Sequence, residues 1–175
     1  MITDIANKRY SDVPDVLRGY LNYMTVIKGR SPNTVKEYYY DIKMFYRFLY
    51  VSLNNISQNE FNKIDLTNFD ESILKNITLN DLYEFMAFVN NTYSSNDNYR
   101  ARKVSSLRSY FNYLHSRLGF ITSNPAADLD SPKIKKRMPR YLTVEESVNF
   151  LKSIKGKNQQ RDFAMFAIFL SCGLR

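Results

Sequence analysis

The chain has 175 residues, of which 44% are hydrophobic and 15% aromatic, so it can form a folded core and general disorder is not expected. Its 25 lysine and arginine residues outnumber its 17 aspartate and glutamate residues, which gives a net charge of +8. This excess favours an anionic partner, nucleic acid first and an acidic membrane surface second. A small basic protein without such a partner can have the same composition. Only the distribution of the charges along the chain can separate these two possibilities.

The single cysteine and the single histidine exclude several classes of site. Cys172 has no partner for a disulfide, and Cys172 and His115 are too few ligands for a zinc site, so we expect neither a metal nor another cofactor. The N-terminal segment has no apolar core of signal-peptide length, and no run approaches the roughly 20 apolar residues of a membrane span. These features predict a cytoplasmic protein without a membrane partner.

Helical periodicity and few helix breakers, five glycines and five prolines, predict an all-α chain. The first helix is expected over about residues 13–27. The second begins at Ser31 and Pro32, an N-cap followed by a proline at the first helical position. An asparagine-rich connector follows over about residues 53–76, and Thr78 begins the third helix. The predicted core of this bundle includes Val35, Ile42, Leu82, Leu107, Phe111 and Leu114.

Basic residues gather on the second and fourth predicted helices. The second carries a basic strip at helical spacing, formed by Lys36, Tyr40, Lys43 and Arg47. The fourth is expected over about residues 98–118, and no acidic residue occurs between Asp97 and Asp128. Solvated helix faces usually mix both signs of charge, so an acid-free face of arginine, serine and asparagine favours contacts with phosphates and bases. An ordinary polar surface is the alternative.

A basic linker and two further helices complete the predicted order. Prolines at 125, 132 and 139, with a cluster of lysine and arginine, predict an extended segment over residues 123–142. Thr143 and Glu146 form a capping box that begins the fifth helix, and the sixth begins near Arg161. The sixth helix is apolar on all sides, which requires surrounding protein. It is either the last core helix of a small domain or the sign of a chain cut inside a domain.

Four stretches resemble the tyrosine recombinase, or phage integrase, family, in particular its Xer-like members. They are SPNTVKEYYYDIKMFYRFL, RKVSSLRSYFNYL, NPAADLDSPKIKKRMPRYLTVEES and DFAMFAIFLSCGLR. The last is similar to the family's first catalytic arginine motif, with Ser-Cys-Gly-Leu-Arg where Thr-Gly-Leu-Arg is usual. The resemblance implies an N-terminal tail (1–12), a four-helix SAM-like core-binding bundle (13–122), a basic linker (123–142) and the N-terminal fragment of a truncated catalytic domain (143–175).

The resemblance also implies a function. Members of the family cleave and rejoin DNA strands through a 3′-phosphotyrosine, without a metal, and assemble with other recombinase subunits into a tetrameric synapse on DNA. Arg175 corresponds to the arginine that grips the scissile phosphate. Because the family's other catalytic residues follow this arginine, we expect the chain to bind duplex DNA without cleaving it.

The expected DNA-binding residues lie on the second helix, the fourth helix and the linker. They are Lys36, Lys43, Arg47, Arg100, Arg102, Lys103, Ser106, Arg108, Lys133, Lys135, Lys136, Arg137 and Arg140. Six of those on the two helices are expected to share one surface: Lys36, Lys43, Arg47, Arg102, Ser106 and Arg108. Three other interpretations stay open: a complete enzyme, a stand-alone helical DNA-binding accessory or regulatory protein, and a helical bundle whose basic faces are merely solvated. The lack of a nucleophile motif counts against the first, and the apolar final helix counts against a native end.

Overall fold

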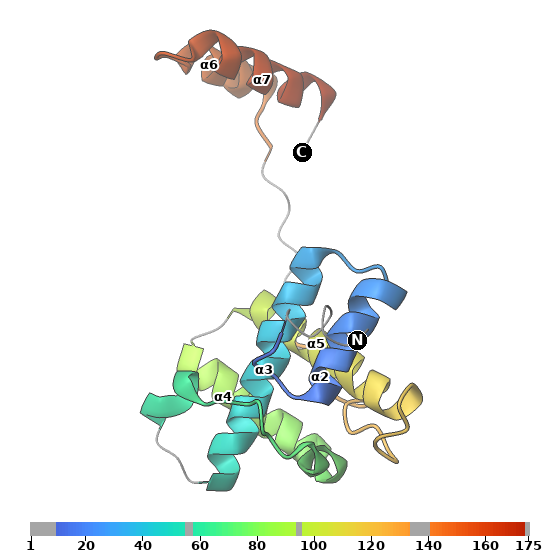
Figure 1. The fold of residues 1–175 in the computed structure, drawn as a ribbon. Coiled ribbons are helices and arrows are strands. Elements are labelled where there is room, and N and C mark those ends of the chain that lie inside the picture. The colour runs from blue at the N-terminus through green and yellow to red at the C-terminus, as the bar shows by residue number, and fades with distance from the viewer. Residues whose placement is uncertain (1–9, 55–57, 94–95, 134–140, 174–175) are drawn as a thin grey trace. The chain divides into compact units, whose positions relative to one another are not determined.

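The computed structural model describes residues 10–54, 58–93, 96–133 and 141–173, and these residues form helices and loops without any β-strand (Figure 1). The all-α prediction is confirmed. The chain divides into two compact units, residues 1–134 and 135–175.

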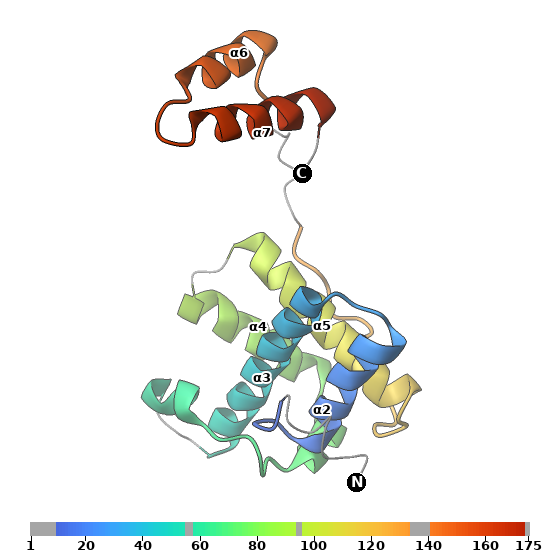
Figure 2. The ribbon, with the colours of Figure 1, turned by 45° about the horizontal axis from the view of Figure 1, so that its top comes forward.

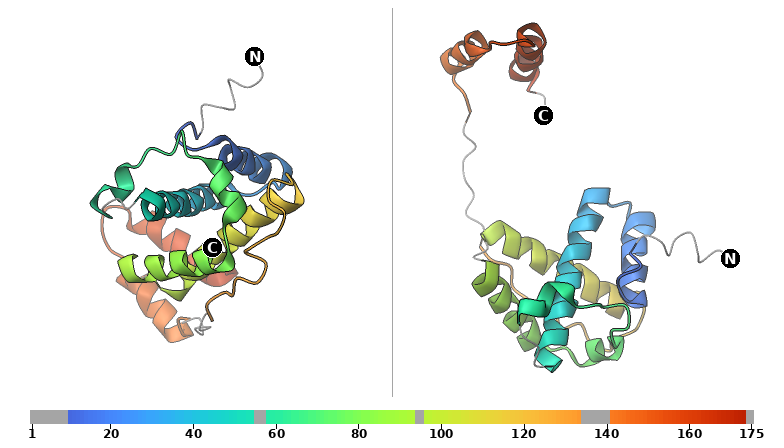
Figure 3. Two further views of the ribbon diagram at one scale, coloured as in Figure 1. Left: turned by 90° about the horizontal axis from the view of Figure 1, so that it is seen from below. Right: turned by 60° about the vertical axis from the view of Figure 1, so that its left-hand side comes forward.

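Unit 1 is a bundle in which α3 runs through the middle, with α2 on one side and α4 on the other (Figures 1 and 2). Helix α5 packs against both α3 and α4, and Figure 3 shows the bundle from two further directions. The elements in chain order are α2 (Asp15–Asn22), the π-helical turn η1 (Tyr23–Ile27), α3 (Pro32–Asn54), the 3-10 helices η2 (Gln58–Lys63) and η3 (Glu71–Asn76), α4 (Leu79–Tyr93) and α5 (Asp97–Ser116).

Short polar side chains set where these helices begin. The Ser31 hydroxyl accepts a hydrogen bond from the backbone N–H of Thr34 at 3.2 Å, directly before α3. The Asn96 side chain accepts one from the N–H of Tyr99 at 2.8 Å and caps α5. Such caps satisfy N–H groups that have no partner within the helix.

Aromatic side chains fill the centre of unit 1. Phe45 of α3 packs edge-on against Phe85 of α4 and Phe111 of α5, with ring centroids 5.2 Å and 5.9 Å apart. This geometry is favourable for buried rings. The predicted core residues are all buried: Val35, Ile42, Leu82, Leu107, Phe111 and Leu114.

The asparagine-rich connector also contributes to the core, because Glu71 of η3 bonds directly to α2 and α3 and is linked to α5 through Tyr46. The Tyr46 hydroxyl donates to Glu71 Oε1 at 3.0 Å and lies 2.6 Å from the hydroxyl oxygen of Tyr110. The backbone N–H of Val16, in α2, donates to Glu71 Oε2 at 3.2 Å. Burial raises the pKa of the Glu71 carboxyl, although these hydrogen bonds oppose the change.

A buried ion-pair cluster joins α3 to α5. Asp41 and Lys103 are each only 1% exposed, and Lys103 Nζ lies 2.9 Å from Asp41 Oδ1. Arg102 Nη1 lies 2.6 Å from Asp41 Oδ2. Burial raises the pKa of the Asp41 carboxyl, and the charges of Lys103 and Arg102 oppose this rise. The carboxylate therefore depends on partners from the other helix.

The segment that follows α5 packs onto unit 1, so the prediction that an extended linker begins at residue 123 is wrong for its first part. Ile121, Ala126 and Leu129 are buried in the core. The Asn124 side chain accepts a hydrogen bond from the N–H of Ala126 at 3.0 Å, which forms a turn around Pro125. The prolines predicted an extended segment, whereas these three apolar residues return the chain to the core.

Unit 2 consists of α6 (Val144–Ser153) and α7 (Gln159–Cys172). The predicted capping box is present: the N–H of Glu146 donates to the Thr143 hydroxyl at 3.1 Å, and the N–H of Thr143 donates to Glu146 Oε2 at 2.7 Å. Phe150 and Phe166 pack edge-on between the two helices, with centroids 5.1 Å apart. Neither helix has a buried side chain within the described residues.

Replacing Asp41 with alanine tests whether the buried cluster holds α3 and α5 together. The change leaves the Lys103 ammonium buried without its partner, so the free energy of unfolding should fall by about 3–5 kcal/mol in urea denaturation. Asp15→Ala is the matched control: its ion pair with Arg18 lies at the surface, where Asp15 is 88% exposed, and should contribute about 0–1 kcal/mol. Equal losses for the two variants would contradict this account.

Candidate nucleic-acid interface

One face of α5 lies in the core, and the opposite face is open to solvent. Ser105, Arg108, Asn112 and Ser116 are exposed along it, at spacings of three and four residues. These side chains carry hydrogen-bond donors, and none of them is acidic. This face, called here the α5 polar face, is the surface where the structure places the acid-free stretch of the sequence.

Arg108 stands beside a recess next to the α5 polar face. It is exposed and has no ion-pair partner among the described residues. The recess has a volume of about 510 Å³ and is lined by Arg108, Ser109, Asn112, Asn124, Ala126 and Ala127. The side-chain oxygens of Asn112 and Asn124 accept hydrogen bonds from Ser116 and from the Ala126 N–H. Their NH₂ groups therefore remain available as donors to a phosphate or a base acceptor.

Arg102 lies at the edge of the α5 polar face that is nearest to α3. Its side chain is 28% exposed and forms ion pairs with Glu37 and Asp41. Its guanidinium also lies over the ring of Tyr99, 5.3 Å from the centroid. This arginine is therefore held in place by α3 while part of it remains accessible.

Two members of the basic strip of α3 are bonded to other residues of unit 1, so they are not the free cations that the prediction requires. Lys43 bonds to Asp12 and Tyr39, and Arg47 donates to the backbone oxygen of Asn62 at 2.8 Å. The two cations thus turn toward the segments before α2 and in η2. Lys36 remains exposed and has no ion-pair partner among the described residues.

Lys103 and Ser106 are also misassigned as DNA contacts, because both are buried. Lys103 is held by Asp41, and the Ser106 hydroxyl donates to the Lys103 backbone oxygen at 2.9 Å. Helical spacing put them beside the exposed serines and arginines. Only the position of α3 shows that they point inward.

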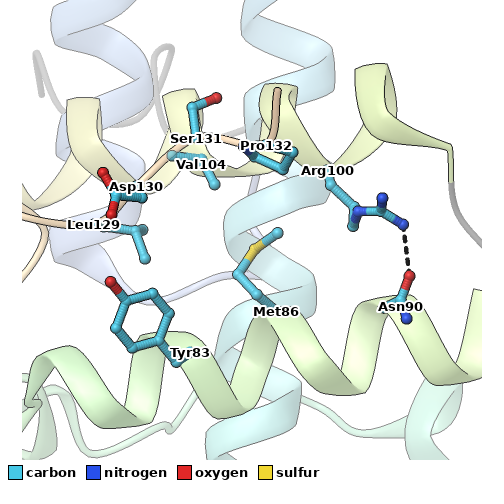
Figure 4. A pocket seen from close by; sticks show the side chains of 9 residues that line it. All are labelled: Tyr83, Met86, Asn90, Arg100, Val104, Leu129, Asp130, Ser131 and Pro132. Atoms are coloured by element: carbon cyan, nitrogen blue, oxygen red, sulfur yellow. Dashed lines mark hydrogen bonds between the residues drawn. The ribbon is translucent and has the colours of Figure 1, made fainter. Parts of the chain in front are cut away.

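Arg100 faces α4. It pairs with Asp97 and donates to Asn90 across one end of a cavity of about 450 Å³ (Figure 4). This cavity is lined by Tyr83, Met86, Asn90, Arg100, Val104, Leu129, Asp130, Ser131 and Pro132. The mixture of apolar side chains with Asp130 does not suit a polyanion.

The remaining predicted site residues belong to the linker and the end of the chain. Lys133 is exposed. Five residues lie outside the described residues: Lys135, Lys136, Arg137, Arg140 and Arg175.

Sequence reasoning missed Asp41, Glu37 and Asn124. Asp41 had a usable signal, because it is an acidic residue next to Ile42 in an otherwise apolar and aromatic stripe of α3. Such a position predicts a buried cationic partner. Asn124 had none, since its place beside Arg108 depends on the fold of the segment after α5.

The described residues contain neither a candidate membrane-spanning helix nor a candidate metal-binding cluster. None of the helices there has the length and apolar character needed to cross a bilayer. No group of three or more histidine, cysteine, aspartate or glutamate side chains in that part of the chain is arranged to hold a metal ion.

The chain is similar to several tyrosine recombinases. Tyrosine recombinase XerC of Caldanaerobacter subterraneus subsp. tengcongensis is 45% identical over 163 residues, covering 93% of this chain and 46% of that protein. XerC of Thermodesulfovibrio yellowstonii is 31% identical over 162 residues (91% and 46%), and a tyrosine recombinase of Pseudothermotoga lettingae is 30% identical over 160 residues (91% and 49%). The chain thus spans about half the length of these relatives. No solved structure gives a significant match.

The family model of the phage integrase N-terminal SAM-like domain matches residues 17–117. That range begins in α2 and ends directly after α5, so it covers the helical bundle of unit 1 and more than half of the chain. The chain therefore belongs to the phage integrase SAM-like domain family of the tyrosine recombinases.

Proposed function

We propose that this chain is the DNA-binding part of a site-specific tyrosine recombinase and that it contacts duplex DNA through the α5 polar face, together with Lys36 at the N-terminal end of α3. The observation that carries the proposal is the character of that face. Arg108 is exposed there without an ion-pair partner among the described residues, beside two asparagine side chains whose NH₂ groups are available. Donors without neighbouring acids suit phosphate oxygens and the acceptor edges of bases.

The net charge and the relatives support the same proposal. A charge of +8 attracts a polyanion over distances of about a Debye length and promotes association. The three similar proteins described above are tyrosine recombinases. On this proposal, unit 1 is the core-binding domain, the linker cations from Lys133 to Arg140 cross a phosphate backbone, and residues 143–175 contribute the first helices of the catalytic domain.

Strand exchange is proposed for the complete recombinase, assembled with further subunits on DNA. Arg175 would grip the scissile phosphate, because a guanidinium matches two phosphate oxygens and stabilises the charge of the transition state. Tyr46 and Tyr110 are poor candidates for the nucleophile. Burial raises the pKa of both hydroxyls well above the ordinary value, and the two side chains bond to each other in the core. We propose that the 175 residues bind DNA without cleaving it.

Replacing Arg108 with glutamine tests the α5 polar face. Affinity for every duplex should fall, and the slope of log K against log salt should become shallower by about 0.9, the loss of one phosphate contact. Lys63→Gln is the control, since it removes one exposed cation from η2. Fluorescence anisotropy at several salt concentrations measures both variants. If the two substitutions have the same effect, the α5 polar face is not the DNA surface.

A nicked duplex that traps covalent intermediates tests the absence of cleavage. Incubation with the 175-residue chain should give a salt-sensitive complex and no protein–DNA adduct after denaturation in detergent. An adduct that survives denaturation would show that a tyrosine in this chain is a nucleophile, and binding without catalysis would be wrong.

A further inference from the structure

The guanidinium of Arg102 is engaged on only one of its three nitrogens. Nη1 lies 2.6 Å from Asp41 Oδ2, 3.0 Å from Glu37 Oε2 and 3.2 Å from the Glu37 backbone oxygen. Nη2 and Nε form no hydrogen bond with any residue that the structure describes. Because the side chain is 28% exposed, this second edge of the planar fork is available to a ligand.

The charges around Arg102 make it a poor phosphate anchor. Arg102 and Lys103 carry two positive charges, and Glu37 and Asp41 carry two negative charges, so the cluster has no net charge. A phosphate that approached Arg102 would meet the exposed carboxylate of Glu37, which bonds to the same guanidinium. Arg108 and Lys36 form no ion pair with an acid among the described residues.

A neutral ligand with two acceptors suits this arrangement better than an anion. In the major groove, guanine presents O6 and N7 side by side, and arginine binds them through two parallel N–H groups. An arginine that is already held by two carboxylates and a ring loses little side-chain freedom when it binds. Its position also restricts which base it can reach.

We infer that Arg102 reads a guanine in the DNA site through its Nη2–Nε edge, and that Asp41 and Glu37 are positioning residues for it. The inference rests on the proposed DNA binding of unit 1. On this inference two arginines of α5 have different roles. Arg108 contributes affinity for the DNA backbone, and Arg102 contributes preference for a base sequence.

Selection from a pool of duplexes with a randomised centre tests this division with the full 175-residue chain. The original chain should enrich sites that share a guanine at one position. Arg102→Gln should lower discrimination at that position by about 10- to 100-fold and leave the salt slope unchanged. Arg108→Gln is the matched control and should keep the guanine while the salt slope becomes shallower. Circular dichroism checks that each variant is folded.

The variant Glu37→Gln distinguishes a positioning role of Glu37 from a purely structural one. The Asp41 contact stays in place, so the fold should persist. Removing the exposed carboxylate adds one positive charge, so affinity for all sequences should rise while discrimination at the guanine falls. Both changes follow only if Glu37 positions Arg102 next to DNA.

Four results would overturn the inference. The first is that Arg102→Gln keeps the guanine and makes the salt slope shallower, which would make Arg102 a phosphate contact. The second is that Glu37→Gln leaves affinity and discrimination unchanged. The third is that the original chain binds DNA without enriching a guanine, which would leave the proposed function standing. If the original chain binds no duplex at all, the proposed function falls as well.

Discussion

A carboxylate that is almost fully excluded from water sets how α3 and α5 cross. Asp41 comes from α3, and its partners Lys103 and Arg102 come from α5. A buried charge without partners is very costly, so the two helices can pack only where all three groups meet. The tyrosine ring of Tyr99 lies 4.5 Å from Lys103 Nζ and covers this ammonium.

This crossing determines which side chains of α5 reach solvent. Once Lys103 points inward, Val104, Leu107 and Phe111 face the core, and Ser105, Arg108 and Asn112 face out. The same crossing leaves Arg102 at the boundary between the two faces. The proposed nucleic-acid interface is therefore a consequence of one ion-pair cluster in the interior.

The local features of the fold could be predicted because they depend on neighbours in the sequence. Ser31 and the Thr143–Glu146 capping box mark helix starts within three residues, and the periodic positions of Ile42 and Leu107 indicate the core. The misassigned residues depend on partners far along the chain. Lys43 turns toward Asp12, 31 residues away, and Lys103 toward Asp41, 62 residues away.

The helical spacing of basic residues does not show which of them are exposed. A lysine on a helix surface and a lysine in a buried ion pair have the same spacing, and only the packed neighbour separates them. The start of the linker was misplaced for a similar reason. Two apolar residues, Ala126 and Leu129, are too few to predict packing in a segment with three prolines nearby.

A titration of the isotope-labelled chain with duplex DNA, followed by two-dimensional amide NMR, locates the DNA-binding surface directly. We predict that the largest shift changes fall on the α5 polar face, at Ser105, Arg108 and Asn112, with smaller changes at Lys36. Changes concentrated on η2 or on the outer side of α4, with α5 unaffected, would contradict it.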